Sequence, residues 1–186
     1  MITTKFIDKE IKYTGPQLSP HWIYKNFEIV GDAVVAFVGE VEVNLSEMVD
    51  IEDVINIEPI YSKKMLNFII ENFGVDLSEM VYRQRLFICQ IKEALEARGI
   101  SVVRDGDDLF YQGKKLSVSI ATKSLTSSLI HTALNIVSEG APIEVSALFE
   151  MGISDVKEFA CDIMERFAKE AKSIKIATCK VRGVFE

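Results

Sequence analysis

DDLFYQGKKLSVSIATKSLTSSLIHTALN, residues 107–135, is the stretch that decides the fold expected for this chain. A Gln-Gly-Lys turn at 112–114 separates two short runs of strand-forming residues, and Gly accepts the positive φ that tight hairpin turns require. A short link then leads to a third such run at 127–135. We therefore expect a hairpin followed by a third strand.

Alternation along these strands predicts which side chains share a face, since successive side chains point to opposite sides of a sheet. From Lys115 onward, one face carries Lys115, Ser117 and Ser119, and the other carries Leu116, Val118 and Ile120. In the next strand, one face carries Ser127, Leu129, His131, Ala133 and Asn135. We expect the lysine, the two serines, the histidine and the asparagine to gather on one surface of the sheet.

Length and composition limit the class of protein. A chain of 186 residues is expected to form a single domain, residues 1–186, with a full hydrophobic core. A net charge of −7 argues against a general nucleic-acid binder. No apolar leader and no run of about 18 apolar residues is present, so we expect a cytoplasmic protein outside the membrane. Cys89, Cys161 and Cys179 have no metal-type spacing, and a disulfide framework is not expected.

The remaining segments mix both kinds of secondary structure. Cap residues and apolar spacing predict helices at 20–27 after Ser19, from Ser62 to Phe73, at 78–98 after Ser78, and from Ser154 onward. Runs of β-branched residues predict strands at 5–14, 33–43, 100–104 and 174–181. This order predicts an α+β fold with a mainly antiparallel mixed sheet flanked by helices.

Three carboxylates lie close together at Asp50, Glu52 and Asp53. Mg²⁺ prefers oxygen ligands and keeps several waters, so these side chains are candidate metal ligands, alone or with the phosphates of a nucleotide. A solvated acidic loop, or the first turn of a helix, is the other interpretation, because negative charge is favoured at a helix N-terminus.

Five further side chains are candidates for binding a substrate. Gln17, His21 and Trp22 surround the start of the first expected helix, where Trp22 also suits the core and His21 also suits a cap or the surface. Arg83 and Arg85 could grip a carboxylate or a phosphate with two hydrogen bonds, although exposure to solvent is the ordinary state of arginines on a polar helix.

The segments DDLFYQGKKLSVSIAT and SLIHTALNI resemble the catalytic core of biotin and lipoate protein ligases and of octanoyltransferases. The matching positions are Asp107 or Asp108, Lys115-Leu116-Ser117, His131 and Asn135-Ile136. The whole chain is more closely similar to a small, mostly archaeal family of uncharacterised proteins with that fold. The segments YTGPQLSPHW, GDAVVAFVGEV, MVDIED, RQRL and KLSVSIAT carry this second resemblance.

The resemblance implies roles for particular residues. Lys115 would contact the carboxyl group of an acid and the α-phosphate of ATP, because a fixed ammonium stabilises developing negative charge. His131 would orient the reactants or handle a proton, and Asp108, Ser117, Ser119 and Asn135 would border the substrate. ATP with Mg²⁺ is the implied cofactor, a small carboxylic acid or a nucleotide is the implied ligand, and nucleic acid is not expected.

Two departures from the ligase pattern motivate an alternative. Val118 stands where the ligases have a glycine, and Ser127 or Ser128 stands where the transferases have their nucleophilic cysteine. No counterpart of the glycine-rich arginine motif of the ligases is found near the N-terminus. The alternative is a non-catalytic small-molecule-binding or regulatory module that keeps the ligase-like fold and that could form a homodimer.

Overall fold

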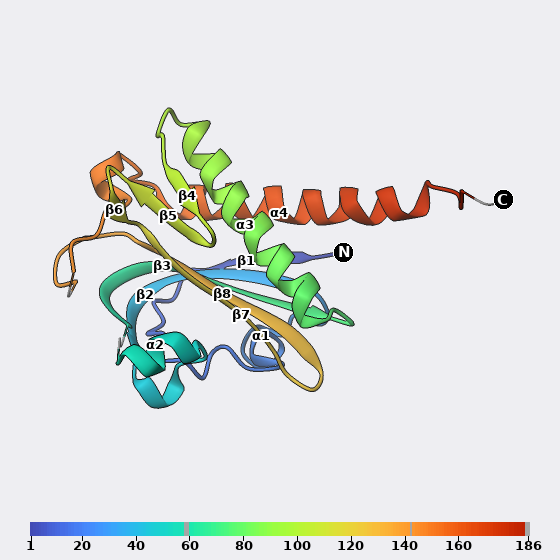
Figure 1. Ribbon diagram of the computed structural model, residues 1–186, viewed down its shortest axis with the longest axis horizontal. Helices are drawn as coiled ribbons and strands as arrows, with labels where there is room; N and C mark the ends of the chain where they lie inside the picture. Colours follow the sequence, from blue (N-terminus) through green and yellow to red (C-terminus); the bar gives the residue numbers. More distant parts are fainter. Residues whose placement is uncertain (58–59, 142, 185–186) are drawn as a thin grey trace.

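The computed structural model describes residues 1–57, 60–141 and 143–184. A five-stranded sheet in the order β1-β2-β3-β8-β7 forms its centre (Figure 1). β1 runs parallel to β2, and the other neighbours are antiparallel. The strands are β1 Thr3–Ile7, β2 Ala33–Val43, β3 Ile60–Phe73, β7 Ser117–Lys123 and β8 Ser127–Asn135.

A small second sheet and four α-helices complete the described fold. The small sheet has the order β4-β5-β6 and lies beside the end of the large sheet at which β8 finishes. Its strands are β4 Val103–Asp105, β5 Asp108–Tyr111 and β6 Lys114–Lys115. The helices are α1 Trp22–Phe27, α2 Ile51–Asn56, α3 Leu77–Glu96 and α4 Val156–Cys179, with 3₁₀ turns at Leu45–Glu47 and Phe149–Met151.

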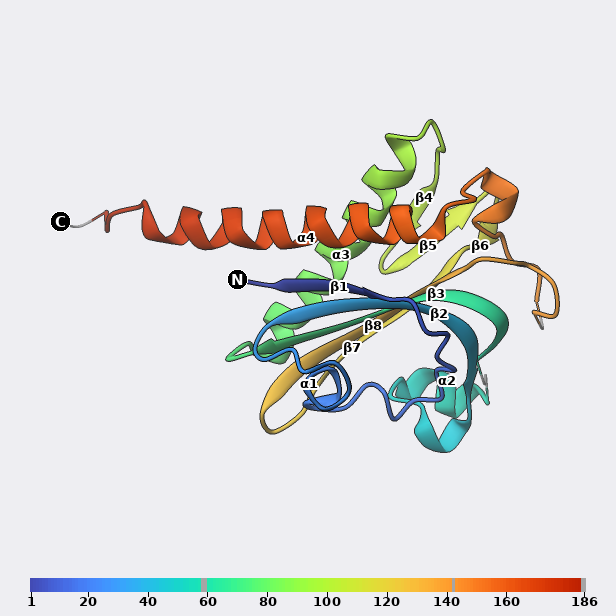
Figure 2. The same ribbon diagram turned by 180° about the vertical axis from the view of Figure 1, so that it is seen from behind.

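Helices α3 and α4 cover one face of the large sheet, and α1 with the irregular N-terminal segment covers the other (Figures 1 and 2). Phe87 of α3 is fully buried and contacts Phe68 of β3 and Phe167 of α4, with ring centroids 5.1 and 5.2 Å apart. On the opposite face, a second cluster contains Phe37 and Ile69. Burial on both faces explains the unbroken apolar runs at 33–37 in β2 and 68–70 in β3.

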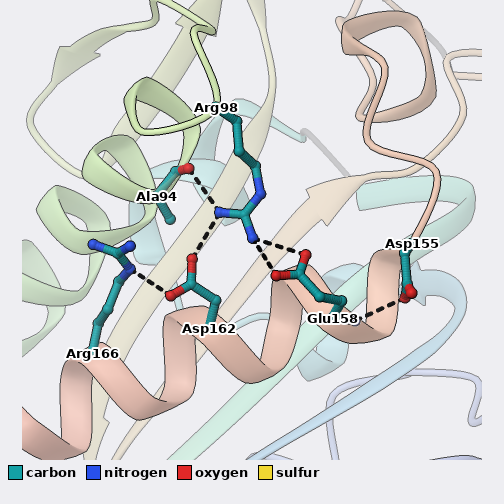
Figure 3. A network of polar contacts seen from close by, with 6 residues as sticks. All are labelled: Ala94, Arg98, Asp155, Glu158, Asp162 and Arg166. Atoms are coloured by element: carbon teal, nitrogen blue, oxygen red, sulfur yellow. Dashed lines mark hydrogen bonds and ion pairs between the residues drawn. The ribbon is translucent and has the colours of Figure 1, made fainter.

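An ion-pair network fixes the crossing of α3 and α4 (Figure 3). Arg98, just after α3, donates to both carboxylate oxygens of Glu158 at 2.7 and 2.8 Å and to Asp162 at 2.7 Å. Arg166 donates to the other oxygen of Asp162. Two-oxygen contacts hold a guanidinium in one orientation. The C-terminal part of α4 extends past the rest of the domain, as Figures 1 and 2 both show.

The α+β fold with a mainly antiparallel sheet is confirmed, but the expected helix from Ser62 to Phe73 is wrong, because this segment is the central strand β3. Between residues 65 and 70 only Asn67 is polar, since both faces are covered there, and a short, mostly apolar run fits a buried helix as well as a buried strand. Its pairing with β2 on one side and β8 on the other decides the outcome.

The expected strand at 174–181 is also wrong, since α4 continues to Cys179. The alternation of residues 174–181 is outweighed by extension of a helix that has already formed, which is far easier than starting one. The helix caps differ from expectation too. Asp76 and Asp155, rather than Ser78 and Ser154, accept the hydrogen bonds from the first turns of α3 and α4.

The remaining boundaries move by a few residues. The first strand is β1, which ends at Ile7 rather than 14, and the first helix is α1, preceded by His21 rather than Ser19. The expected strand at 100–104 is β4, which begins at Val103. The turn between β5 and β6 is confirmed, and Gln112 and Gly113 both have positive φ. In the described part of the chain, no helix has the length and apolar character needed to cross a membrane.

Candidate functional site

A cavity of about 330 Å³ opens where β7, β8 and the end of β3 meet the small sheet and α2. Most of its wall is apolar, which is usual for a small-molecule site with a few polar groups for orientation. The apolar lining comes from Tyr13, Leu18, Val43, Met48, Val49, Ile60, Tyr61, Met65, Val118, Ile120, Ala141, Ile143 and Val145. The polar lining comes from Glu47, Asp50, Asp53, Ser62, Asp107, Asp108, Lys115, Ser117, Ser119, His131 and Asn135.

Lys115 is the single cationic side chain among the described lining residues. Its Nζ lies 2.9 Å from a carboxylate oxygen of Asp108, and both side chains are about one-third exposed. The backbone of Leu116 ties this pair to both sheets, because its N–H donates to Leu109 of β5 and its carbonyl accepts from the N–H of Asn135. Lys115 is therefore held at the junction of the two sheets, within reach of a ligand.

The expectation that the lysine, both serines and His131 share one face of the sheet is wrong. β7 starts at Ser117, so Lys115 lies on a different strand of a different sheet. The register of β7 and β8 pairs Ile120, not Ser119, with His131. Ser119 points to the α3 face, where its hydroxyl accepts from Gln84 and lies 2.9 Å from the hydroxyl of Thr132. Lys115, Ser117, Ser119 and His131 nevertheless all border the cavity.

His131 lies at the floor of the cavity and is 4% exposed. Tyr13 stacks on its ring, with centroids 3.7 Å apart, and Nε2 is 3.0 Å from Oδ1 of Asn67. Since the Asn67 amide NH₂ donates to Met65, its oxygen must accept, and Nε2 of His131 carries the proton. Burial lowers the pKa of His131 to about 3. A neutral, stacked imidazole supports the wall, and the proton-handling role stays a prediction that this environment disfavours.

Asp107 links the cavity to α3. Its two carboxylate oxygens accept from Arg85 at 2.6 Å and from Gln84 at 2.8 Å. Burial raises the pKa of Asp107, and the positive charge of Arg85 opposes that rise. Arg85 thus acts on the cavity through Asp107 and does not line it. Ser117 is also engaged, because its hydroxyl accepts from the backbone N–H of Leu109 at 2.9 Å.

The acidic candidates separate in the structure. Asp50 is the N-cap of α2 and accepts from the N–H of Glu52, while Asp50 and Asp53 border the cavity and Glu52 does not. Among residues 1–57, 60–141 and 143–184, no three Asp, Glu, His or Cys side chains are grouped to hold a metal ion. The magnesium site at Asp50, Glu52 and Asp53 stays a prediction, and the helix-start interpretation fits Asp50.

Four candidates for substrate binding lie away from this cavity. The side chain of Gln17 closes the turn at Thr14, and Trp22 packs on Phe27 and Phe37. Arg83 pairs with Glu79 of its own helix. The fourth, His21, borders a different cavity. Asn135, in contrast, lines the first cavity and accepts from the hydroxyl of Ser62 at 3.2 Å.

Sequence reasoning missed the residues that form the apolar wall. Tyr13 and Leu18 come from the N-terminal segment, and Met65 comes from a strand that was expected to be a helix. Val118 and Ile120 were assigned to the face away from the site, although the β7–β8 register brings them beside His131. Tyr13 lay at the end of the strand expected at 5–14, and nothing in the sequence placed it beside His131.

Comparison with known proteins places the chain among uncharacterised relatives. A family model described as a domain of unknown function, DUF366, matches residues 2–182. The uncharacterized protein MJ0805 of Methanocaldococcus jannaschii is 38% identical over 176 residues, covering 91% of this chain and 80% of that protein. A solved structure of a protein of unknown function from Pyrococcus horikoshi has 36% identity to this chain and a TM-score of 0.94. The similarity covers 99% of this chain and 100% of the Pyrococcus chain.

More distant structures share the fold. The biotin protein ligase from Aquifex aeolicus, solved in complex with biotin and ATP, has a TM-score of 0.60 at 15% identity. The similarity covers 94% of this chain and 71% of the ligase. A putative lipoate protein ligase from T. acidophilum with bound lipoic acid has a TM-score of 0.57 at 13% identity. The similarity covers 90% of this chain and 86% of that ligase chain. The ligase-like fold expected from the sequence is thus confirmed.

Proposed function

The chain belongs to the family described as a domain of unknown function, DUF366, and on this premise we propose that it binds a small carboxylic acid with an apolar body. The observation that carries the proposal is the position of Lys115, which is about one-third exposed and is the single cation among the described lining residues of a cavity whose wall is mostly apolar. Ligands of this kind bury their apolar part against the wall and orient through a few polar contacts.

Lys115 must exchange partners for this ligand to bind. In the free protein its ammonium is paired with Asp108, and the mouth also carries Glu47, Asp50 and Asp53. A carboxylate that enters therefore has to lie on the Lys115 side of the cavity, with its apolar part against Val118 and Ile120. Val118 stands where the ligases have a glycine, so a ligand here meets an apolar side chain where a glycine would let it approach the backbone.

We expect Lys115→Met to weaken the binding of whichever of octanoate, lipoate and biotin binds the wild type, by roughly 10- to 100-fold. A charge-assisted hydrogen bond contributes about 1.5–3 kcal/mol, and 1.4 kcal/mol is a factor of ten in affinity. Isothermal titration calorimetry measures the effect.

Lys114→Met is the matched control, because Lys114 is a neighbouring lysine that pairs loosely with Glu144 and does not line the cavity. It should leave the affinity unchanged. Equal affinity for wild type and Lys115→Met, or no binding of any of the three acids to the wild type, contradicts the proposal.

Activation of the acid by ATP is the second candidate, favoured by the same lysine. In that step a carboxylate oxygen forms a bond to the α-phosphorus and pyrophosphate leaves, and the chemistry requires no proton transfer that His131 would have to supply. The acidic mouth opposes free ATP, and Asp50 and Asp53 suit a Mg²⁺ ion that arrives with the nucleotide, since such an ion needs only one or two protein carboxylates.

Thermal unfolding in the presence of nucleotide tests this candidate. ATP with Mg²⁺ should raise the melting temperature by mass action, and ATP with a chelator should not. A shift that is the same with and without Mg²⁺, or no shift with either, rejects the activation step while leaving acid binding to the calorimetry.

The projecting part of α4 suggests a homodimer. Buried Met164 and Phe167 start a stripe that continues at Ala171, Ile174 and Thr178, with the alternating spacing of three and four that pairs two helices. Ile174 is 45% exposed. We propose that a second copy of this chain covers the stripe in parallel. Glu170 and Lys175 occupy the flanking positions at which opposite charges meet across such a pair.

Ile174→Glu is expected to turn a dimer into a monomer in analytical ultracentrifugation, since it introduces charge into the paired stripe. Ile176→Glu is the matched control: Ile176 is 53% exposed and lies on the outer side of the helix, so the dimer should persist. A monomeric wild type, or the same response from both variants, rejects this interface.

A further inference from the structure

A second cavity of about 330 Å³ lies on the same face of the sheet as the first but at the other end of β3. It shares no lining residue with the first. Its lining comes from His21, Tyr24, Ile29, Val30, Gly31, Glu71 and Phe73. Most of these side chains are apolar or aromatic, and the one carboxylate among the described lining residues is Glu71.

Glu71 is an unusual residue in this position, because it is 2% exposed and charged groups are almost never buried without a partner. One of its oxygens, Oε1, accepts from the backbone N–H of His21 at 2.8 Å and from the hydroxyl of Ser127 at 2.6 Å. In the described ranges, neither a Lys, an Arg nor a His ring forms an ion pair with it.

The second oxygen of Glu71 is left for a ligand. No donor in the described part of the chain bonds to Oε2, and this atom is not among the fully enclosed polar atoms that lack a partner. It therefore borders open space, and the cavity is the space that Glu71 lines. A buried carboxylate oxygen at a cavity is a strong acceptor for a cationic donor, because the low dielectric strengthens their attraction.

The rest of the wall suits a cation as well. The rings of His21 and Phe73 stack with centroids 5.6 Å apart, and Tyr24 stands at the rim with half of its surface exposed. Aromatic faces attract cations through their quadrupoles. Ile29 and Val30 supply an aliphatic side against which a short carbon chain packs.

The backbone at this cavity is held in a costly conformation. His21 has φ 61°, in the left-handed region that residues with a Cβ seldom occupy. Strained backbone of this kind is found at binding sites, where the surrounding structure maintains it. Here the hydrogen bond from His21 N–H to Glu71 maintains it, so the same carboxylate shapes the rim and faces the cavity.

We propose that this second cavity binds a small primary amine as its ammonium cation, with Glu71 Oε2 accepting from the ammonium and the alkyl chain lying against Ile29 and Val30. The inference does not rest on the function proposed for the first cavity. The two sites draw on opposite ends of β3, so one can fail its test while the other passes.

The test uses n-butylammonium as the probe and 1-butanol as a neutral molecule of the same shape, added to the full chain and followed by NMR. Butylammonium should shift the signals of the His21 ring and the Ser127 amide in a saturable way, and 1-butanol should not. Butanol that shifts the same signals with similar affinity would overturn the proposal, because the cavity would then be a merely apolar one.

Two variants test the roles of lining residues, and a third is a control. Glu71→Gln keeps an oxygen for His21 N–H and removes the charge, so the affinity for butylammonium should fall at least tenfold while the fold is kept. Glu93→Gln removes one exposed charge on α3 and should change nothing. Tyr24→Ala, at a half-exposed position, should weaken binding about threefold, the scale of an exposed cation–π contact. Unchanged affinity in both Glu71→Gln and Tyr24→Ala rejects the site.

Discussion

Lowering the pH from 7.5 to 4.5 is expected to reduce the free energy of unfolding of the wild type by about 3 kcal/mol more than that of a His131→Phe variant. Burial lowers the pKa of His131 in the folded protein to about 3, whereas an unfolded chain has the ordinary value of 6.5. Between these values the unfolded chain takes up a proton that the folded protein does not, so acid favours unfolding. Above pH 6.5 both states are neutral and the contribution is constant.

Urea unfolding across this pH range measures the difference. Phe keeps the stacking on Tyr13 and removes the titrating group, so His131→Phe should have lower stability at neutral pH, through the loss of the Asn67 hydrogen bond, and a flatter pH dependence. His21→Asn is the control, because Asn tolerates the left-handed conformation of residue 21 and His131 is retained. Parallel pH profiles for wild type and His131→Phe would show that His131 titrates normally.

The region of the site followed from the sequence, and its internal geometry did not. The Gln112-Gly113 turn and the alternation after it are local features, so they predicted the hairpin and the presence of Lys115 and His131 at one place. Which faces of β7 and β8 coincide depends on the register between two strands. In that register Ile120 lies opposite His131, a pairing that no single strand encodes.

The helix predicted at 62–73 shows a different limit. Met65, Leu66, Ile69 and Ile70 have the spacing of a helical stripe, and the same residues are required in a strand that is buried on both faces. Only the partners on either side, β2 and β8, distinguish the two. The wrong helix also affected the predicted site, because Met65, which lines the cavity, was not expected to lie on a strand of the sheet.

Gly39→Ala should reduce the free energy of unfolding by about 3 kcal/mol or more. This is the upper part of the range for a methyl group that is inserted where the packing leaves no room for it. A Cβ on Gly39 would lie 1.9 Å from the carbonyl oxygen of Ile11 and 2.6 Å from its carbonyl carbon. These are backbone atoms, and they are fixed, because Ile11 N–H donates to Val38 and Tyr13 N–H donates to Glu40. The N-terminal segment therefore has to leave β2 for the methyl group to fit.

That displacement connects the fold to the site, because Tyr13 belongs to the displaced segment and covers His131. Urea unfolding gives the loss of stability, and the NMR signal of the His131 ring reports the loss of the ring above it. Gly74→Ala is the control: nothing lies within 4 Å of its Cβ, and its φ of 69° limits the cost to backbone strain of about 1 kcal/mol. If Gly39→Ala lowers the free energy of unfolding no more than Gly74→Ala does and leaves the His131 signal in place, the position of the N-terminal segment does not depend on the absence of a side chain at residue 39. If both change together, one glycine in β2 holds the wall of the cavity against the sheet.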